Sequence, residues 1–449
     1  MSCMRCYGVR RFFLALAASG ALVLVKSSAL ADYPVVSHRY AADPAALVHG
    51  GRLYVYCSHD DENWTNSYTM RSIVCFSTDD LKNWTDHGVV FNATNHTTWA
   101  SLAWAPSVAY RSNLFYLYFA NGASGIGVAT SSVPTGLFRD ARGSALINSS
   151  TPGAYSPTQW YFDPCAFIDD DGLAYMYFGG QYPTNSRVIG LNPNLVAVFG
   201  SAMPLETTNF FEAIYINKRD GTYYLSYSTR PEAGMVIAYA TSTNPTNGFV
   251  YRGTVLPNPP QNLWNNNHHS IVEFNGTWYI VYHNRAAAIA NGIPNDLAVY
   301  KRSICIDRLE FNADGTIKQV TPTEDGLPQL KYLNPYTRVE AETIAKQSGI
   351  KTDVCGEGGM MVASVTNGSW IRLRGVNFGA GASRFLARVA SGSQGGTIQL
   401  RLDSLQGQII GELNVPATGG WQNWITAATT VTNATGVHDL YFVFTGSSG

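Results

Sequence analysis

A short aromatic strand pattern recurs five times along this chain of 449 residues, and it limits the possible folds more than any other feature. Each copy begins with a turn residue, has Tyr three places on, and alternates like a half-buried strand. The copies begin at Gly51, Asn113, Gly172, Gly221 and Gly276, which are 62, 59, 49 and 55 residues apart. Repeats of this length with several strands each are typical of β-propeller blades. We predict an all-β fold in which residues 33–326 form a five-bladed β-propeller; a β-sandwich with irregular hairpins is the alternative.

The composition agrees with many short strands, because 42 Gly, 26 Tyr and 10 Trp stand beside only 14% charged residues. The 30 Lys and Arg against 31 Asp and Glu give no basic excess, which argues against a nucleic-acid partner. No segment after the N-terminal run is apolar enough to span a bilayer, so we expect no membrane partner. We also expect a monomer.

Residues 1–31 have the pattern of a secretory signal peptide. Three arginines precede an apolar run from Phe12 to Val25, and the small-residue cleavage pattern Ala29-Leu30-Ala31 follows. A membrane anchor is the alternative, but the run is short for a bilayer. We therefore expect a secreted, extracellular protein that is cleaved after Ala31.

Five cysteines follow this segment: Cys57, Cys75, Cys165, Cys305 and Cys355. None belongs to a CxxC pair, so neither a zinc site nor a dense disulfide scaffold is indicated. The sequence allows one or two disulfide bridges, and we take Cys57 with Cys75 as a trial pairing.

The positions eight or nine residues before the five repeats hold Asp43, Ala105, Asp163, Glu212 and His268. The strand before each repeat would be the innermost of its blade, so these positions should converge on the axis. A single Asp-Pro usually marks only a turn, but three carboxylates in phase with the repeat indicate a functional site on the axis. Their apolar flanks would raise the pKa of the carboxyl groups and favour acid–base chemistry.

These segments resemble glycoside hydrolase family 43, in order, over about residues 33–330. The resemblance is carried by Asp43-Pro44, Trp104-Ala105-Pro106, Phe162-Asp163-Pro164, Glu212 ahead of Lys218-Arg219-Asp220-Gly221, and Asn267-His268-His269-Ser270 ahead of Tyr282-His283. It implies a five-bladed propeller and an inverting glycosidase that acts on arabinose- or xylose-containing plant polysaccharides.

The resemblance implies that Asp43 is the general base, Glu212 the general acid, and Asp163 the carboxylate that orients the acid and tunes its pKa. Inversion needs one carboxylate to activate water and one protonated carboxyl to release the leaving oxygen. A third carboxylate nearby helps to keep the acid protonated.

Three more residues receive roles from the resemblance. His268 matches a histidine that helps to hold a calcium ion on the propeller axis through water, although calcium prefers oxygen ligands and a single His is usually structural. Trp104 is predicted to form the floor of the sugar site, with a core position as the alternative, and Arg285 is predicted to bind substrate. No cofactor is expected for the chemistry itself.

A second domain is predicted at residues 338–449, after a linker at 327–337. Alternating strands with Gly, Asn and Ser turns favour a β-sandwich of jelly-roll type. The segments Val339-Glu340-Ala341-Glu342 and Thr418-Gly419-Gly420-Trp421 resemble carbohydrate-binding module family 6. The resemblance implies a structural calcium at Glu340 and Glu342 and a sugar-stacking platform at Trp421.

Two departures from that family leave a purely structural module as the alternative. The sequence stops at Gly449, short of the last strand of the family, and Ser364 stands where an aromatic partner platform is often found.

Together these features predict a secreted inverting exo-glycosidase that removes α-L-arabinofuranosyl groups from arabinoxylan of the plant cell wall. A β-D-xylosidase, or an enzyme with both activities, is the alternative within the family. A non-catalytic carbohydrate-binding protein is the alternative of a different class. A retaining fructan enzyme of family 32 or 68 would place its nucleophile in Asn-Asp-Pro, whereas Asp43 follows Ala42.

Overall fold

The computed structural model describes residues 33–62 and 66–446, and this part of the chain is nearly all β, as predicted. The predicted signal peptide at 1–31 lies outside the described residues. The helices of the described part are single short turns: α1 (Ala93–His96), α2 (Ala286–Ala290) and α3 (Asn295–Ala298), with 3-10 turns at Pro183–Asn185 and Pro231–Ala233. None of these helices could cross a membrane.

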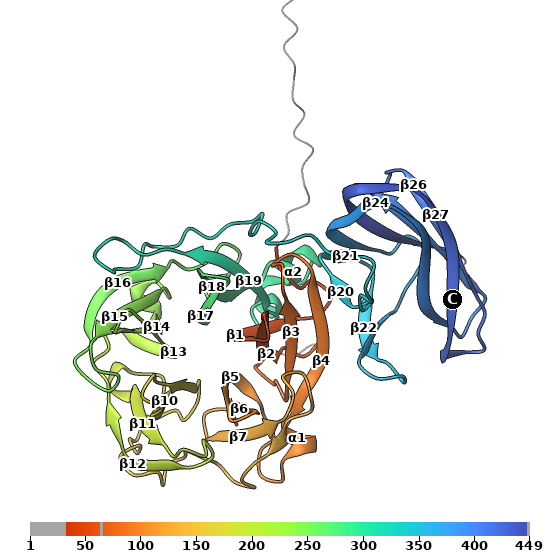
Figure 1. The fold of residues 1–449 in the computed structure, drawn as a ribbon. Helices are drawn as coiled ribbons and strands as arrows, with labels where there is room; N and C mark the ends of the chain where they lie inside the picture. The colour runs from red at the N-terminus through yellow and green to blue at the C-terminus, as the bar shows by residue number, and fades with distance from the viewer. Residues whose placement is uncertain (1–32, 63–65, 447–449) are drawn as a thin grey trace, which may run out of the picture. The chain divides into compact units, whose positions relative to one another are not determined.

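Five antiparallel sheets follow one another along residues 41–309, each with its strands in chain order (Figure 1). The first has β1 (Ala41–His49), β2 (Arg52–His59), β3 (Ser72–Thr78) and β4 (Trp84–Asn92); the second has β5 (Trp104–Arg111), β6 (Leu114–Ala120), β7 (Ile126–Ser131) and β8 (Arg139–Asp140). The third has β9 (Cys165–Ile168), β10 (Ala174–Phe178), β11 (Arg187–Leu191) and β12 (Val198–Pro204). The fourth has β13 (Phe210–Arg219), β14 (Thr222–Thr229), β15 (Ile237–Ser242) and β16 (Val250–Leu256), and the fifth has β17 (His269–Phe274), β18 (Thr277–Asn284) and β19 (Ser303–Leu309).

The five repeats of the sequence form the second strand of each sheet. The first strands β1, β5, β9, β13 and β17 contact one another in that order, and β17 contacts β1. In Figure 1 these first strands lie toward the middle of the five sheets, while β4, β12 and β16 lie at the periphery. Residues on the first strands therefore meet at a common centre.

Tight hairpins join the first and second strands because the turn residues accept left-handed backbone angles. Gly50 and Gly51 have φ of 56° and 76°, and Asp220 and Gly221 have φ of 48° and 76°. Two consecutive positive φ angles are the requirement of the two-residue turn that matches the twist of a hairpin. The turn residues at the start of each repeat thus fix where its hairpin closes.

The second Tyr of three repeats ties neighbouring sheets together. The hydroxyl of Tyr56 donates to the carbonyl of Pro134 at 2.7 Å, that of Tyr118 to Leu195 at 2.8 Å, and that of Tyr177 to Pro245 at 2.7 Å. All three rings are fully buried. The periodic Tyr therefore fills the space between sheets with its ring and satisfies a loop carbonyl of the next sheet with its hydroxyl.

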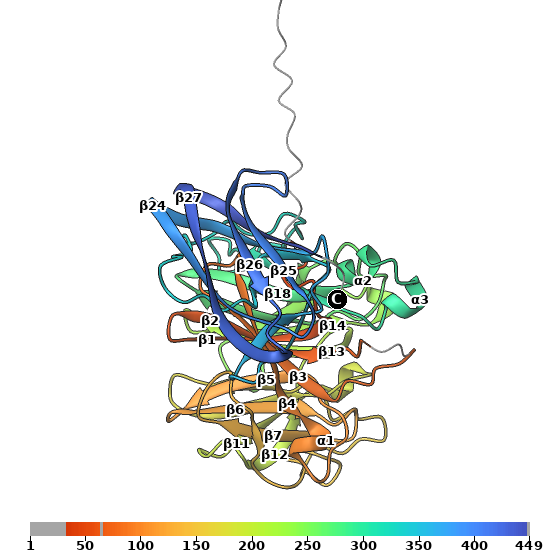
Figure 2. The same cartoon turned by 90° about the vertical axis from the view of Figure 1, so that its right-hand side faces the viewer.

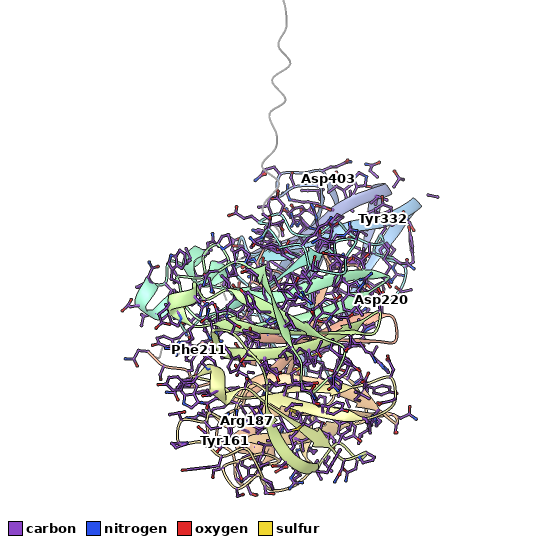
Figure 3. The ribbon with its side chains drawn as sticks, turned by 90° about the vertical axis from the view of Figure 1, so that its left-hand side faces the viewer. Tyr161, Arg187, Phe211, Asp220, Tyr332 and Asp403 are labelled. Carbon is purple, nitrogen blue, oxygen red and sulfur yellow. The ribbon has the colours of Figure 1, made fainter. Side chains whose placement is uncertain are left out.

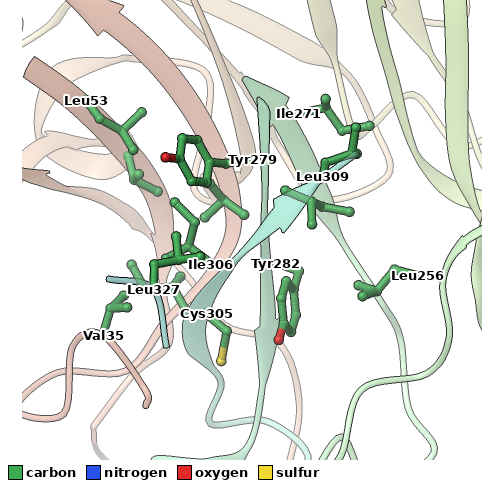
Figure 4. Close-up of a cluster of buried hydrophobic side chains, with 14 of the residues drawn as sticks. Val35, Leu53, Leu256, Ile271, Tyr279, Tyr282, Cys305, Ile306, Leu309 and Leu327 are labelled. Carbon is green, nitrogen blue, oxygen red and sulfur yellow. The ribbon is translucent and has the colours of Figure 1, made fainter. Parts of the chain in front are cut away.

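Apolar side chains from before the first and after the last of the five sheets close the core between the first, fourth and fifth sheets. This cluster includes Val35, Leu53, Leu256, Ile306 and Leu327, with the rings of Tyr279 and Tyr282 among them (Figure 4). Residues before β1 and after β19 thus pack against the same interior.

The remaining strands form a five-stranded antiparallel sheet and a separate hairpin. The sheet has the order β21 (Lys346–Ser348), β24 (Trp370–Ser391), β27 (Gly420–Thr445), β25 (Gly395–Leu402) and β26 (Ile409–Pro416), and the hairpin pairs β22 (Lys351–Val354) with β23 (Met360–Ala363). The long strands β24 and β27 run side by side, with several irregularities in their register (Figure 2). Leu373, Val376 and Leu440 of these strands share a buried cluster with Leu400 of β25.

A short strand of the predicted second domain extends the first sheet. β20 (Thr343–Ile344) pairs antiparallel with β4, with Thr343 opposite Thr85 and Ile344 opposite Trp84. Residues beyond the predicted linker thus complete the edge of the first sheet.

The trial pairing of Cys57 with Cys75 was wrong, because both thiols are free and buried. The register of β2 and β3 places Cys75 opposite Tyr56, and Cys57 opposite Val74. Successive side chains of a strand point to opposite faces, so the two sulfurs lie on different sides of the sheet. They accordingly belong to two different core clusters.

Candidate active site

Four residues at or just before the first strands share an unusual backbone conformation. Asp43, Ala105, Asp163 and Ala213 have φ angles of 51°, 39°, 48° and 58°. The pairing of β1, β5 and β13 with their second strands is interrupted at this point. Residues with a Cβ adopt a left-handed φ only where the structure imposes it, so the same bulge is built into the first, second and fourth sheets. Asp163 has the matching φ just before β9, whose pairing with β10 is regular.

Ala213 is the counterpart of Asp43 in its sheet, so the predicted equivalence of Glu212 was wrong by one residue. Asp43 lies two places before Ala45, which pairs with Tyr56, and Ala213 lies two places before Tyr215, which pairs with Ser226. The spacing of nine residues belongs to the third sheet alone, where a longer hairpin loop connects Ile168 with Ala174.

Asp43 is buried among cationic and polar groups. Its Oδ1 lies 2.5 Å from Nη1 of Arg302, 3.6 Å from Nδ1 of His268 and 3.5 Å from Nδ1 of His283. Burial alone would raise the pKa of this carboxyl, but Arg302 and the two histidines outweigh burial and lower it from 3.8 to about 2. Asp43 is therefore ionised at any pH at which the protein would work.

Arg302, which the sequence reasoning missed, is the cation that sets this charge. It lies just before β19, is almost fully buried, and also binds Asp60 through Nη2 at 2.7 Å and Nε at 3.0 Å. Its guanidinium lies 4.9 Å from the centre of the Tyr68 ring. The only signal in the sequence was a charged pair, Lys301-Arg302, directly ahead of an apolar strand.

Asp163 is buried and held by the backbone of the next sheet. The N–H of Ala213 donates to its Oδ2 at 2.8 Å, and Nδ1 of His268 lies 3.8 Å from the same oxygen. Burial, then the negative charges of Glu212 and Asp43, raise the pKa of Asp163 well above its usual value. The bulge at Ala213 thus positions Asp163 from the neighbouring strand.

Glu212, near the start of β13, is a buried carboxyl group without a matching cation. Its Oε1 is inaccessible to water and accepts no hydrogen bond. Burial and the charge of Asp43 raise its pKa from 4.5 to about 8, against the opposing effects of Arg302, Arg285 and Asn266. Because Asp163 receives a backbone N–H and Oε1 of Glu212 receives none, a proton shared between the two is favoured on Glu212.

Aromatic side chains border Glu212 and Asp163. Phe211, labelled in Figure 3, directly precedes Glu212 and lies edge-to-face against Trp160 at 6.1 Å. Trp160 also contacts Phe162, the neighbour of Asp163, at 5.3 Å. These three rings thus pack together next to the segments that carry the two carboxyl groups.

The ring of His268 lies between two carboxyl groups, with Nδ1 3.6 Å from Oδ1 of Asp43 and 3.8 Å from Oδ2 of Asp163. Burial is the main cause that lowers its pKa from 6.5 to about 4, and Asp43 opposes the shift. His283, which is also buried, accepts the backbone N–H of Asp43 at Nδ1, 3.2 Å away. Both rings are neutral near pH 7.

The structure places Trp104 at the start of β5, half-buried, with its ring centroid 6.4 Å from that of Tyr68 in an edge-to-face arrangement. Its indole nitrogen is buried and has no hydrogen-bond partner. Arg285 is fully buried and donates to Oδ1 of Asn266 at 2.5 Å and to the carbonyl of Val299 at 3.1 Å. The Arg285 guanidinium therefore fastens the loop that carries Asn266.

The remaining predicted residues lie in the C-terminal sheet region. Trp421 opens β27, is 59% exposed, and lies across Gly392, where an added Cβ would meet the indole at 2.7 Å. Glu340 forms an ion pair with Arg338 at 2.9 Å. Glu342 is buried, and burial is the main cause that raises its pKa from 4.5 to about 7.

The same side chains bear on whether the protein itself could ligate a metal ion. Within residues 33–62 and 66–446, no three His, Cys, Asp or Glu side chains form a group that could hold a metal ion. His268 faces two carboxylates, and Glu340 and Glu342 are only two acids. The predicted calcium ions therefore lack a protein ligand set of this kind.

Asp43 and Glu212 are buried in one region, and near neutral pH the first is ionised while the second is protonated. Such a pair can activate a water molecule and protonate a leaving oxygen in the same reaction. The fold and the site thus define a hydrolytic enzyme of the two-carboxyl type.

Comparison with known proteins agrees with this class. The model of the family described as glycosyl hydrolases family 43 matches residues 31–317, and that of carbohydrate binding module family 6 matches residues 340–449. The chain belongs to glycosyl hydrolases family 43 and is a glycoside hydrolase.

Relatives match almost the whole chain. An arabinoxylan arabinofuranohydrolase of Paenibacillus polymyxa is 40% identical over 92% of this chain and 72% of its own length. One of Bacillus subtilis (strain 168) is 39% identical over 92% of this chain and 89% of its own. The crystal structure of a family 43 arabinoxylan arabinofuranohydrolase from Bacillus subtilis, in complex with cellotetraose, superposes with a TM-score of 0.88 at 39% identity and covers 93% of this chain and 95% of that one.

Proposed function

We propose that this protein is an inverting exo-glycosidase that removes α-L-arabinofuranosyl groups from arabinoxylan. The observation that carries the proposal is the opposite protonation of two buried carboxyl groups, with a pKa of about 2 at Asp43 and about 8 at Glu212. The names of two relatives that match 92% of the chain supply the substrate class.

In this mechanism Asp43 is the general base. Its carboxylate takes a proton from a water molecule, and that water attacks the anomeric carbon of the arabinofuranosyl group from the side opposite the leaving oxygen. Glu212 gives its proton to that oxygen, and the bond between sugar and polymer breaks. Direct displacement by water inverts the anomeric configuration, and solvent exchange then restores both protonation states.

Asp163 acts through Glu212 in this proposal. In this proposal the proton of the coupled pair rests on Glu212, so the ionised Asp163 disfavours a second charge on Glu212 and keeps the acid protonated. The N–H of Ala213 holds Asp163 in place at 2.8 Å. The half-buried Trp104 is proposed to form the floor of the sugar site, and the fully buried Arg285 supports the site through the loop that carries Asn266. A hydrolytic reaction of this kind needs no cofactor.

The five-bladed β-propeller is proposed for residues 33–326 on the basis of five sequential sheets whose first strands contact one another in a ring. A linker at 327–337 and a β-sandwich at 338–449 complete the proposed architecture. The exposed indole of Trp421 lies at the start of a long strand, where it can stack on a sugar ring and hold the polymer.

Calcium is proposed as a structural ion in the second module and on the propeller axis. The support in the module is Glu342, a buried carboxyl whose raised pKa a bound cation would lower. Calcium should then raise the melting temperature of the wild type relative to EDTA, and should raise that of Glu342→Gln by less. His268→Ala tests the axial site in the same way, and equal melting of all variants in both buffers would refute both sites.

Secretion to the extracellular space, and a monomeric state there, are part of the proposal. The polymer substrate cannot enter a cell, and the N-terminal pattern at 1–31 suits export. Mass spectrometry of the secreted protein should give Asp32 as the first residue, and light scattering should give the mass of one chain. Retention of residues 1–31 on the exported protein would contradict the cleavage.

The function is tested by analysis of the sugars released from wheat arabinoxylan, beside aryl α-L-arabinofuranoside and aryl β-D-xyloside. Arabinose should be the product from the polymer, and Asp43→Asn and Glu212→Gln should each lower its release by several decades. Glu324→Gln, which changes an exposed carboxyl, is the matched control and should behave like the wild type. Xylose as the sole product would favour the xylosidase alternative, and binding without release would favour a non-catalytic protein.

A further inference from the structure

Trp264 is more exposed than any other large apolar side chain of the described ranges, at 79%. It lies in the loop between β16 and β17, three residues before the polar pair Asn267-His268. An exposed indole gains free energy whenever a ligand covers it, so such a side chain beside an active site indicates a binding surface.

The backbone around Trp264 is strained. Gln261, Leu263 and Trp264 have left-handed φ angles of 61°, 53° and 49°, a conformation that bulky residues rarely adopt. Strain of this kind persists where surrounding contacts impose it, and it is concentrated at ligand-binding sites.

Two buried groups impose this conformation. The side-chain amide of Asn262, which is almost fully buried, donates to the carbonyls of Asn265 and Asn266, both at 3.1 Å. The backbone N–H of Arg285 donates to the carbonyl of Gln261 at 3.0 Å. The loop is thus fastened on both sides of Trp264, and the indole is held in solvent.

The loop is continuous with the active site. The hydroxyl of Tyr68 lies 3.5 Å from Oδ1 of Asn265 and 3.3 Å from Oδ1 of Asn266, and the Tyr68 ring contacts Trp104. The side chain of Asn266 also interacts with Glu212 and opposes the rise of its pKa. Trp264 is therefore two residues from a group that contacts the proposed acid.

We propose that Trp264 binds the main chain of the polysaccharide by stacking on a xylopyranose ring near the branch that is cleaved. The proposal rests on the proposed function, in which the arabinofuranosyl branch enters the pocket and the polymer remains outside it. A β-1,4-linked xylopyranose ring has equatorial substituents and a flat face of C–H groups, which suits the face of an indole. Trp264 would then select a polymeric substrate over a small arabinoside.

The test compares two substrates in Trp264→Ala and in a control. Wheat arabinoxylan reaches the main-chain surface, whereas an aryl α-L-arabinofuranoside fills only the pocket. Trp264→Ala should lower kcat/KM for arabinoxylan about tenfold, mainly through KM, and should keep kcat/KM for the aryl substrate within about twofold. The control is Tyr251→Ala on the outer strand β16, where the ring is 47% exposed, and it should leave both values unchanged.

A stability measurement separates a binding role from a structural one. Trp264→Gly removes a bulky residue from a left-handed position, so its melting temperature should equal or exceed that of the wild type. Polymer activity should fall in this variant as it does in Trp264→Ala. A lower melting temperature, equal losses on both substrates, or full activity on arabinoxylan would each overturn the proposal.

Binding can also be measured without catalysis. In native gels that contain soluble arabinoxylan, Glu212→Gln should be retarded more than Glu212→Gln with Trp264→Ala. Both proteins should carry Trp421→Ala, so that the second module does not mask the difference. Equal retardation would refute the role of Trp264 even if the enzyme released no arabinose, whereas unequal retardation without any release would refute the proposed function alone.

Discussion

At the scale of single residues, the site depends on two buried carboxyl groups, Asp43 and Glu212, whose different surroundings give them opposite protonation states. Both lose solvation, which favours their neutral forms. Asp43 regains the ionised form chiefly through the charge of Arg302, whose Nη1 lies 2.5 Å from Oδ1. Glu212 has an unpaired Oε1 and a negative neighbour, so it stays protonated. The same burial therefore produces a base at one position and an acid at the other.

The pH profile of kcat/KM should report these two states. Activity requires ionised Asp43 and protonated Glu212, so kcat/KM should fall on the basic side near pH 8 and show no acid limb above about pH 3 that titrates Asp43. Asp163→Asn removes a negative charge near Glu212, which lowers the pKa of Glu212 and should move the basic limb to lower pH. Asp170→Asn, an exposed acid, is the control for this shift. A basic limb that stays in place in Asp163→Asn would contradict the role of Asp163.

Arg302 should be essential to both charge and stability. Arg302→Met leaves Asp43 and Asp60 buried without their cation, and losing one partner of a buried ion pair costs about 3–5 kcal/mol. Urea denaturation at pH 7 measures this loss. The folded-state pKa of Asp43 lies below its unfolded value because of Arg302, so the contribution of that pair is present above about pH 4 and fades as the pH falls toward 2.

The control for this variant is Arg308→Met, which breaks an exposed pair with Glu310 and should change the free energy of unfolding by less than about 1 kcal/mol. A difference between Arg302→Met and wild type that is the same at pH 7 and pH 3 would contradict the assignment to Asp43.

Sequence alone could find Asp43 and Asp163 because each precedes a proline and lies eight or nine residues before a repeat. It could not find Arg302, whose partners Asp43 and Asp60 lie 259 and 242 residues away in the chain. It placed Glu212 one residue out of register, because the spacing of a repeat does not reveal the length of each hairpin loop. Contacts between distant segments carry no local signal.

At the scale of strands and sheets, the prediction was accurate where local turn chemistry decides the structure. The five repeats became the second strands of five sheets because their turn residues accept positive φ angles. The pairing of Cys57 with Cys75 failed at the same scale, because it depends on which face of the strand each sulfur occupies.

The buried Tyr hydroxyls between sheets should contribute to stability independently of one another. Tyr118→Phe leaves the carbonyl of Leu195 without its donor and should lower the free energy of unfolding by about 1–2 kcal/mol. Tyr177→Phe should cost a similar amount, and the double variant should lose about the sum, since the two act on different sheet pairs.

Tyr110→Phe is the matched control for these variants, because its hydroxyl donates to the exposed side chain of Asn113 and should be nearly neutral. Urea denaturation compares all four proteins. Losses at Tyr118 and Tyr177 no larger than that at Tyr110 would contradict the proposed role of the hydroxyls.

At the scale of the whole molecule, the C-terminal region contributes to the first sheet. β20 pairs with β4, and the hydroxyl of Thr352 donates to the buried carboxylate of Asp86 at 2.7 Å while it accepts Nη2 of Arg39 at 3.0 Å. The side-chain oxygen of Asn83 likewise accepts the N–H of Arg374 at 2.8 Å. A composition shift near residue 338 could suggest a domain boundary, but it could not reveal these contacts.

Thr352→Val should therefore destabilise the protein although Thr352 is far in sequence from β4. It removes one donor to Asp86 and one acceptor of Arg39, at a cost of about 1–3 kcal/mol. Thr432→Val, at an exposed position of β27, is the control and should change stability little. Equal melting temperatures for the two variants would contradict the coupling between the C-terminal region and the first sheet.

The central claim is that Asp43 and Glu212 carry out a single displacement that inverts the anomeric carbon of an arabinofuranosyl group. Proton NMR of the first sugar released from wheat arabinoxylan, recorded before mutarotation, tests it most directly. The account predicts β-L-arabinofuranose as the first product in the wild type and no detectable early product in Asp43→Asn or Glu212→Gln. Early release of the α-anomer, or of xylose in place of arabinose, would contradict it.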